Sequence, residues 1–226
     1  GWRRWLLFAI LAADAVAIFL SYSRGGLLGF SVVLLLCLLC WARRWARLPA
    51  LAILALAVSA WLPTYWGRGQ GFSDLREDTT VQQRLDTITA GWRMFEDRPL
   101  LGVGPGCSEI GWPIYAPHPE ISQDNLHIHN TFVQALGETG LAGFLLVVLL
   151  LGCGVIKAHR LARLWQLRGG RGPYLLVSAI GISLAGLLVC GFSGGYVFTW
   201  FPYLVLALVS AAQRLPAPAQ PAVQGF

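Results

Sequence analysis

Residues 141–156 read LAGFLLVVLLLGCGVI, an apolar run without a single charged side chain. With an amphipathic lead-in that begins near Thr131, this stretch is long enough to cross a hydrocarbon core of about 30 Å. The whole chain of 226 residues is 56% hydrophobic and only 12% charged, whereas a soluble domain usually carries about 25% charged residues. The composition therefore excludes a soluble globule, a disordered chain and a nucleic-acid-binding module.

Five further apolar stretches are predicted to span a membrane, although the last is short: 5–23, 25–42, 48–66, 174–192 and 200–212. Together with 141–156 they predict an all-α fold, a polytopic membrane helix bundle of about six transmembrane helices. Residues 1–214 are expected to form a single membrane-embedded domain. The tail 215–226, rich in Pro, Ala and Gln, is expected to be disordered and cytoplasmic.

The basic residues predict the orientation of this bundle. Of the 17 Lys and Arg residues, 11 lie in connections at one side, where no Asp or Glu accompanies them: Arg3, Arg4, Arg43, Arg44, Arg47, Lys157, Arg160, Arg163, Arg168, Arg171 and Arg214. Because Lys and Arg are enriched in cytoplasmic loops, that side is predicted to be cytoplasmic. The net charge of +6 thus reports topology rather than a nucleic-acid partner, and the long connection 67–130 is placed outside the cytoplasm.

This external connection is predicted to contain an amphipathic helix. Thr80-Val-Gln-Gln83 resembles a capping box that opens a helix. A stripe of apolar residues then repeats at helical spacing up to Pro99, where the helix should end: Val81, Leu85, Ile88, Trp92 and Phe95. The helix is expected to lie flat on the membrane surface or on the bundle.

Two arginines of this helix are candidate anion ligands. Arg84 flanks the apolar stripe and can reach a site between the helix and the bundle, whereas Arg93 points away from the stripe toward water. A solvated surface charge remains the alternative for each arginine. A third cation, Arg24, is the only charge in the short turn between the first two spans. It either snorkels to the interface or binds an anion at headgroup level.

The segment Leu101-Gly-Val-Gly-Pro-Gly106 has the glycines of a tight turn with exposed backbone N–H groups. Gly104 and Gly106 could form an anion-binding nest, and the alternative is simply a turn after a helix. No Lys-Ser or Lys-Thr follows, as a P-loop requires, and no strand–helix context favours a dinucleotide site.

The segment His127-Ile-His-Asn-Thr131 stands where the external connection re-enters the membrane. Asn130 is a good helix N-cap, and Asn130, Gln134 and Glu138 form a polar stripe on the outer turns of the following span. An imidazole near pKa 6.5 is suited to general-base work, which makes His129 and His127 candidates. The alternative for both is an interfacial histidine with a structural hydrogen bond. No cluster has metal-ligand spacing, so no metal or cofactor is expected.

Taken together, these motifs form a pattern: Ser23-Arg-Gly-Gly26, Arg84, Trp92, Pro99-Leu-Leu-Gly-Val-Gly-Pro-Gly106 and His129-Asn-Thr-Phe-Val-Gln-Ala-Leu-Gly-Glu-Thr-Gly-Leu-Ala-Gly143. From about residue 20 to 145 the chain resembles the O-antigen ligase and Wzy-type polymerase superfamily of bacterial envelope glycosyltransferases. Members typically have ten to twelve spans, so the chain resembles the C-terminal half of one or a shortened member.

The resemblance implies a metal-independent transfer at the periplasmic face of the bacterial inner membrane. A glycan would move from an undecaprenyl-diphosphate carrier to a hydroxyl of lipid A-core or of another glycan, among membrane lipids. Arg24 and Arg84, with Arg93 as a further cation, would engage the diphosphate. His129 would activate the acceptor hydroxyl, although the His-x-His pair leaves His127 open.

Three activities share these motifs: ligation to lipid A-core, which we favour, polymerisation of repeat units, and transfer to protein. A membrane transporter using Asp14, the only acid deep in a predicted span, is an alternative of another class. A non-catalytic scaffold is a third alternative, but it would leave Arg24, Arg84 and His129 unexplained.

Overall fold

The computed structural model describes residues 1–226 except 22, 42–50, 52–78, 122–125 and 216–226. All regular elements in the described ranges are helices, which confirms the predicted all-α class. The α-helices are α1 (Trp2–Leu20), α2 (Arg24–Trp41), α4 (Thr79–Asp97), α5 (Ser108–Tyr115), α6 (Thr131–Leu167), α7 (Arg171–Cys190) and α8 (Trp200–Ala211), and short 3₁₀ turns cover Pro119–Ile121 and Ala212–Arg214.

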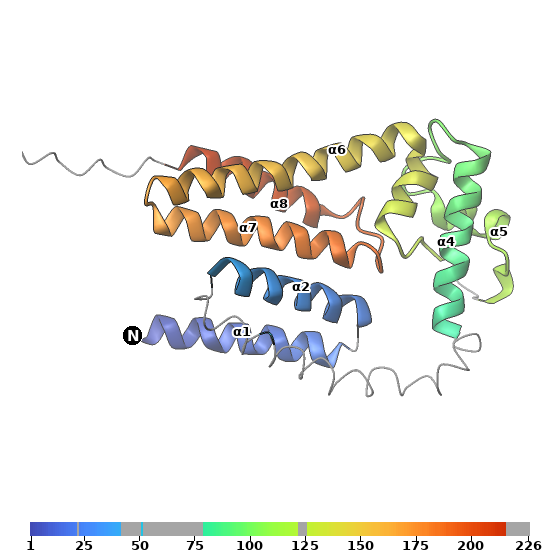
Figure 1. The fold of residues 1–226 in the computed structure, drawn as a ribbon. Coiled ribbons are helices and arrows are strands. Elements are labelled where there is room, and N and C mark those ends of the chain that lie inside the picture. The colour runs from blue at the N-terminus through green and yellow to red at the C-terminus, as the bar shows by residue number, and fades with distance from the viewer. Residues whose placement is uncertain (22, 42–50, 52–78, 122–125, 216–226) are drawn as a thin grey trace, which may run out of the picture.

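A bundle is formed by α1, α2, α6, α7 and α8, and α4 lies across one end of it (Figure 1). Helix α7 is central, because it contacts α2, α6 and α8, while α1 packs on α2. Helix α4 contacts the beginning of α6 and the short helix α5. This crosswise helix therefore places its side chains at the same end of the bundle as the start of α6 and the end of α7.

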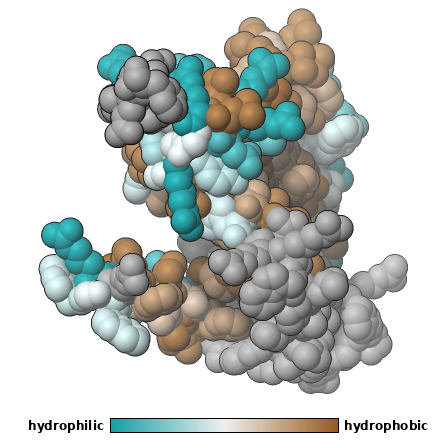
Figure 2. Space-filling model, turned by 60° about the vertical axis from the view of Figure 1, so that its left-hand side comes forward, coloured by the Kyte–Doolittle hydropathy of each residue, from teal (hydrophilic) through white to brown (hydrophobic). Residues whose placement is uncertain are grey.

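Among the residues that the structure describes, two helices, α6 and α7, are long and apolar enough to cross a membrane, and α1 and α2 contain shorter apolar helices. Leu146 and Leu149 on α6 and Leu176 on α7 are exposed, and apolar side chains reach the molecular surface beside hydrophilic ones (Figure 2). Such an outward apolar surface fits a lipid environment. The count of six spans stays a prediction. The predicted span 48–66 and nearly all of the tail 215–226 lie outside the described residues.

A kink at Gly140 divides α6 into a short first segment, 131–139, and a long second one. Gly140 has φ 64° and ψ −168°, a conformation that is essentially restricted to glycine. A Cβ atom there would also stand 2.4 Å from the carbonyl carbon of Leu100. The kink turns the first segment back toward the end of α7 (Figure 1), which determines where the residues just before α6 lie.

The glycine-rich segment after α4 supplies the hydrogen bonds that the kink interrupts. The N–H of Leu141 donates to the carbonyl of Pro99 at 2.8 Å, and the N–H groups of Val103 and Gly104 donate to the carbonyls of Gly137 and Glu138. Backbone groups freed inside an apolar bundle are costly unless they find such partners. The segment 99–106 is therefore a clamp on the kinked helix.

Helix α4 is amphipathic, as predicted, but it packs through a different face. Two residues of its predicted apolar stripe, Leu85 and Trp92, are 53% and 50% exposed, whereas Ala90 and Met94 on the opposite face are buried. Small residues decide this choice, because a Cβ on Gly137 of α6 would come within 2.7 Å of the carbonyl oxygen of Gly91. Only a glycine face permits that close an approach.

Candidate active site

Hydrogen bonds connect the start of α6 both to its own first turn and to the segment that follows α7. Asn130 is the N-cap, as predicted, and its side-chain oxygen accepts from the N–H groups of Phe132 and Val133, both at 3.0 Å. Its Nδ2 donates to the carbonyl of Phe192 at 3.1 Å. The capping side chain therefore starts the helix and ties it to residues 191–199, which connect α7 to α8.

Thr131 extends this attachment. Its N–H donates to the carbonyl of Gly191 at 2.7 Å, and its hydroxyl donates to the carbonyl of Gly194 at 2.6 Å. The same hydroxyl oxygen accepts from the N–H of Tyr196 at 2.9 Å. Three segments distant in sequence are thus joined at one end of the bundle, because the start of α2 also reaches the connection: a Cβ on Gly25 would clash with the Ser193 side chain.

His129 lies at this junction, half-buried between α4 and the bundle. Its backbone N–H is 3.5 Å from Oγ1 of Thr87 on α4, and its ring lies 4.4 Å, centroid to centroid, from the ring of His127. Burial lowers the pKa of His129 below 6.5, and the charges of His127 and Arg84 lower it further. The imidazole is therefore neutral and able to accept a proton at neutral pH.

Arg84 brings a cation to the same place. It is half-buried on α4, and its charge acts on both His129 and Tyr196. Burial raises the pKa of the Tyr196 hydroxyl, Cys190 adds to the rise, and Arg84 opposes it. A cation, a neutral imidazole and a phenol from three separate segments are thus close enough to influence each other.

The remaining predicted cations are placed differently. The backbone of Arg24 begins α2, at the end that packs on residues 191–199, but its side chain lies outside the described part of the structure. Arg93 donates from Nη1 to the carbonyl of Tyr115 at 3.1 Å, so it links α4 to α5. A diphosphate-binding role for either arginine stays a prediction. Asp14, which a transporter would use, is exposed on α1.

The polar stripe and the glycine motif contact each other through Glu138. Glu138 is completely buried, and its carboxylate accepts hydrogen bonds from the N–H of Gly106 and from Nε2 of Gln134. The N–H of Gly104 donates to the backbone carbonyl of Glu138. The glycine-rich turn therefore contacts the side chain of Glu138, which fastens segment 99–106 to α6, and an anion-binding role for Gly104 and Gly106 stays a prediction.

Two residues of the junction were not singled out by the sequence: Thr87 and Tyr196. Thr87 follows Arg84 by one helical turn, and its hydroxyl donates to the Arg84 carbonyl at 2.9 Å. This spacing places both residues on the same side of α4, and the sequence alone could have indicated it. Tyr196 stands in a glycine-rich connection far along the chain, and no local pattern marks it. Among the residues described, no group of three or more His, Cys, Asp and Glu could hold a metal ion.

A family model described as O-antigen ligase matches residues 7–148, which is more than half of the chain. The chain belongs to the O-antigen ligase family. No curated protein matches it. Membership of the O-antigen ligase family implies a membrane enzyme of the glycosyltransferase kind, with a glycan donor and an acceptor as substrates. The matched region contains Arg84 and His129, whereas Tyr196 lies beyond the part of the chain that the O-antigen ligase model covers.

Proposed function

We propose that this member of the O-antigen ligase family transfers a glycan from an undecaprenyl-diphosphate carrier to an acceptor hydroxyl at the periplasmic face of the bacterial inner membrane. Lipid A-core is the acceptor that we favour. The observation that carries the proposal is the neutral, half-buried imidazole of His129 within the electrostatic reach of Arg84, at one end of an apolar helix bundle.

In the proposed reaction the acceptor oxygen attacks the anomeric carbon of the carrier-linked sugar. The bond between that carbon and the diphosphate oxygen breaks, and the diphosphate leaves with the bonding electron pair. His129 takes the proton of the acceptor hydroxyl as the new glycosidic bond forms. A positioned general base typically contributes about 10²–10⁴-fold to the rate, and the depressed pKa of His129 favours the neutral form that this role requires.

Arginines would replace a metal ion as the stabiliser of the leaving group. Negative charge grows on the diphosphate as the bond breaks, and preorganised cations lower the energy of that transition state. Arg84 is the cation closest to this role, because its charge already acts at His129. Arg24 would approach from the start of α2 and Arg93 from the same helix as Arg84. Each charge-assisted contact should be worth about 1.5–3 kcal/mol.

The proposal is tested by His129→Ala in a membrane preparation supplied with carrier-linked glycan and lipid A-core. We expect transfer to fall by about 10²-fold or more while binding of the carrier is retained. His127→Ala is the matched control, because it removes the neighbouring imidazole and should reduce transfer far less. Near-normal transfer by His129→Ala would contradict the general-base role, and loss only in His127→Ala would assign that role to the other histidine.

The acceptor is tested separately, in a strain that lacks the gene. Loss of all glycan-capped lipopolysaccharide bands on a gel would support ligation to lipid A-core. Retention of bands capped with a single repeat unit would instead assign the chain to repeat-unit polymerisation, the other activity shared by these motifs. Unchanged banding would exclude both lipopolysaccharide roles and leave exopolysaccharide polymerisation or transfer to a protein acceptor.

A further inference from the structure

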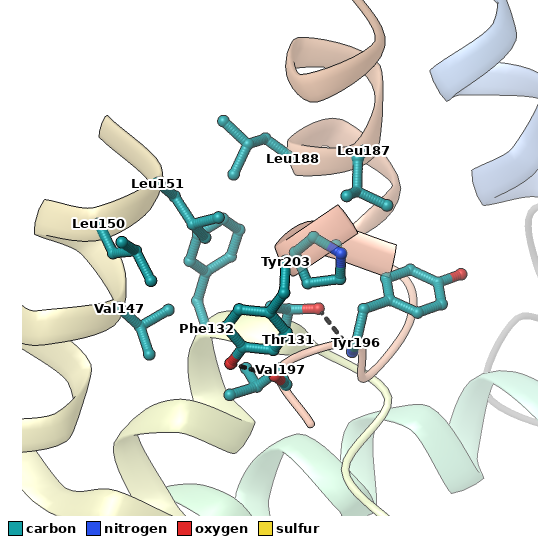
Figure 3. Close-up of a pocket in the computed structure, with 12 residues that line it drawn as sticks. Thr131, Phe132, Val147, Leu150, Leu151, Leu187, Leu188, Tyr196, Val197 and Tyr203 are labelled. Carbon is teal, nitrogen blue, oxygen red and sulfur yellow. Dashed lines mark hydrogen bonds between the residues drawn. The ribbon is translucent and has the colours of Figure 1, made fainter. Parts of the chain in front are cut away.

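Two neighbouring leucines of the clamp 99–106 are highly exposed. Leu100 is 70% and Leu101 76% exposed, although both stand at the kink where α6 begins its long apolar segment. Other apolar side chains of the kinked helix have partners within the protein: Phe132 of the first segment points toward Leu151 of the second (Figure 3), and Leu151 is buried. The two leucines of the clamp have no such cover among the described residues.

Backbone hydrogen bonds hold this leucine pair beside the start of the apolar run 141–156. The N–H of Leu141 donates to the carbonyl of Pro99 at 2.8 Å, and the N–H of Ala142 donates to the carbonyl of Leu100 at 3.3 Å. These bonds replace those that the kink removes from α6, so breaking them would expose backbone groups of the helix. The position of the leucine pair relative to α6 is therefore fixed.

The leucine pair stands at the end of an exposed apolar row on α6. Leu141, Leu145 and Leu149 follow each other at intervals of four residues, and they are 43%, 55% and 63% exposed. Helix α6 is long and apolar enough to cross a membrane, and the family to which the chain belongs consists of membrane enzymes. Such a row fits contact with the acyl chains of lipids.

The length of this apolar run leaves part of a bilayer uncovered. From the kink to Lys157 the run 141–156 is about 24 Å long at 1.5 Å per residue, whereas the hydrocarbon core of a bilayer is about 30 Å thick. The charged Lys157 limits the run at one end. The remaining thickness of about 6 Å falls at the kink, where Leu100 and Leu101 are the exposed apolar side chains of the clamp.

We propose that the turn formed by Leu100 and Leu101 inserts into the membrane leaflet on the α4 side, where lipid acyl chains cover both leucines. A charged pair directly before the turn limits the depth of insertion. Nε of Arg98 lies 3.6 Å from Oδ2 of Asp97, and both side chains are more than half exposed. Such charges stay at the level of the headgroups. The insertion does not depend on which glycan or acceptor the enzyme uses.

The inserted turn determines how α4 sits on the membrane. The N–H of Arg98 donates to the carbonyl of Met94 at 3.0 Å, and the N–H of Gly102 donates to the carbonyl of Arg98 at 2.9 Å. The turn therefore continues the last turn of α4 without a flexible linker. Because α4 also carries Arg84, anchoring its end in the bilayer keeps this cation at a constant height above the hydrocarbon.

Fluorescence quenching by brominated lipids tests the insertion directly. In the full chain without its five native cysteines, Leu101→Cys is labelled with the fluorophore NBD and reconstituted in vesicles of phosphatidylethanolamine, phosphatidylglycerol and acyl-brominated phosphatidylcholine. We expect loss of emission, and a greater loss with bromines near the headgroup than with bromines near the chain end. Glu120→Cys is the control, because Glu120 is exposed in a polar 3₁₀ turn of the same connection and its label should keep its emission.

Two results of the quenching experiment would overturn the proposal. Emission at position 101 that is quenched no more than emission at position 120 would show that acyl chains do not reach the turn. A label at position 101 that is shielded from water but escapes quenching would show that a protein partner, and not lipid, covers the leucines.

The match between the turn and the bilayer thickness provides a second test. We expect the combined variant Leu100→Ser and Leu101→Ser to reach its highest unfolding temperature in bilayers thinner than the wild type prefers, by up to about 6 Å. Ile110→Ser with Ile114→Ser is the matched control, because these isoleucines of α5 are 73% and 76% exposed and should leave the preferred thickness unchanged. An unchanged optimum for the leucine variant, or an equal shift in both variants, would contradict the proposal.

Discussion

The imidazole of His129 owes its neutral state to burial and to two neighbouring side chains, His127 and Arg84. Burial acts first, because a half-buried ring loses the hydration that stabilises its charged form, and electrostatic repulsion from His127 and Arg84 lowers the pKa of His129 further. A base of lowered pKa stays unprotonated further into the acid range than an ordinary histidine. If His129 is the general base, the acid limb of the profile of kcat against pH should depend on His127 and Arg84.

We therefore expect His127→Gln to move the acid limb of kcat to higher pH. The charge of His127 lowers the pKa of His129, so its removal raises that pKa and the base becomes protonated sooner as the pH falls through the range near 6.5. At pH 8 the rate should change little. The measurement is kcat against pH, with His118→Gln as the control, because His118 pairs with Asp86 at 3.1 Å. An acid limb that stays in place or moves to lower pH would contradict this assignment.

At the scale of the residue, the sequence predicted features that depend on contacts between residues close together in the chain. Asn130 was predicted as the N-cap because its chemistry and the following helical pattern are adjacent in sequence, and the structure confirms it. Tyr196 could not be predicted, because it is brought to the site by a hydrogen bond to Thr131, 65 residues away. The contact of Arg93 with Tyr115 similarly depends on how α5 folds back along α4.

At the scale of the element, the kinked α6 organises the site. The sequence predicted a helix from near Thr131 through the apolar run 141–156. The structure confirms that start but continues the helix to Leu167, through residues that were expected to lie in a connection. The break at Gly140 could not be foreseen, because nothing in the helical pattern marks this glycine. It becomes necessary only when the clamp 99–106 hydrogen-bonds across it. The face through which α4 packs could not be predicted either, because it depends on the close approach of Gly91 on α4 to Gly137 on α6.

We expect Gly140→Ala to destabilise the protein by about 1–3 kcal/mol and to reduce transfer strongly. The backbone conformation there suits only glycine, and the new Cβ would collide with the carbonyl of Leu100. Gly152→Ala is the control on the same helix, because a Cβ at that position meets nothing within 4 Å. Thermal unfolding in detergent measures the difference. Equal stability of the two variants would show that the kink tolerates a side chain.

At the scale of the whole molecule, composition predicted the all-α class because an apolar chain in lipid must satisfy its backbone within helices. The position of α4 across the end of the bundle could not be predicted, since amphipathicity alone fits either a membrane surface or a protein surface. The orientation of the bundle remains a prediction from the distribution of Lys and Arg. It can be tested with residues at opposite ends of the described structure.

We expect a membrane-impermeant maleimide applied from the periplasmic side to label Cys107 in a variant without other cysteines. Cys107 is a half-buried free thiol just before α5, in the connection predicted to be external. Gln166→Cys, introduced in place of Cys107 at an exposed position near the end of α6 that is predicted to be cytoplasmic, should react only after the membrane is opened. Labelling of the second position in sealed spheroplasts, but not of the first, would invert the topology.

The hydrogen bonds of Thr131 to Gly191, Gly194 and Tyr196 have a consequence for protein engineering. The region shared with the family ends at residue 148, yet the histidine just before α6 takes its position from a connection more than 40 residues beyond that boundary. A chimera that exchanges only the shared region between two relatives would receive His129 without the connection 191–199 that positions it. The shared region and the connection 191–199 must therefore be exchanged together.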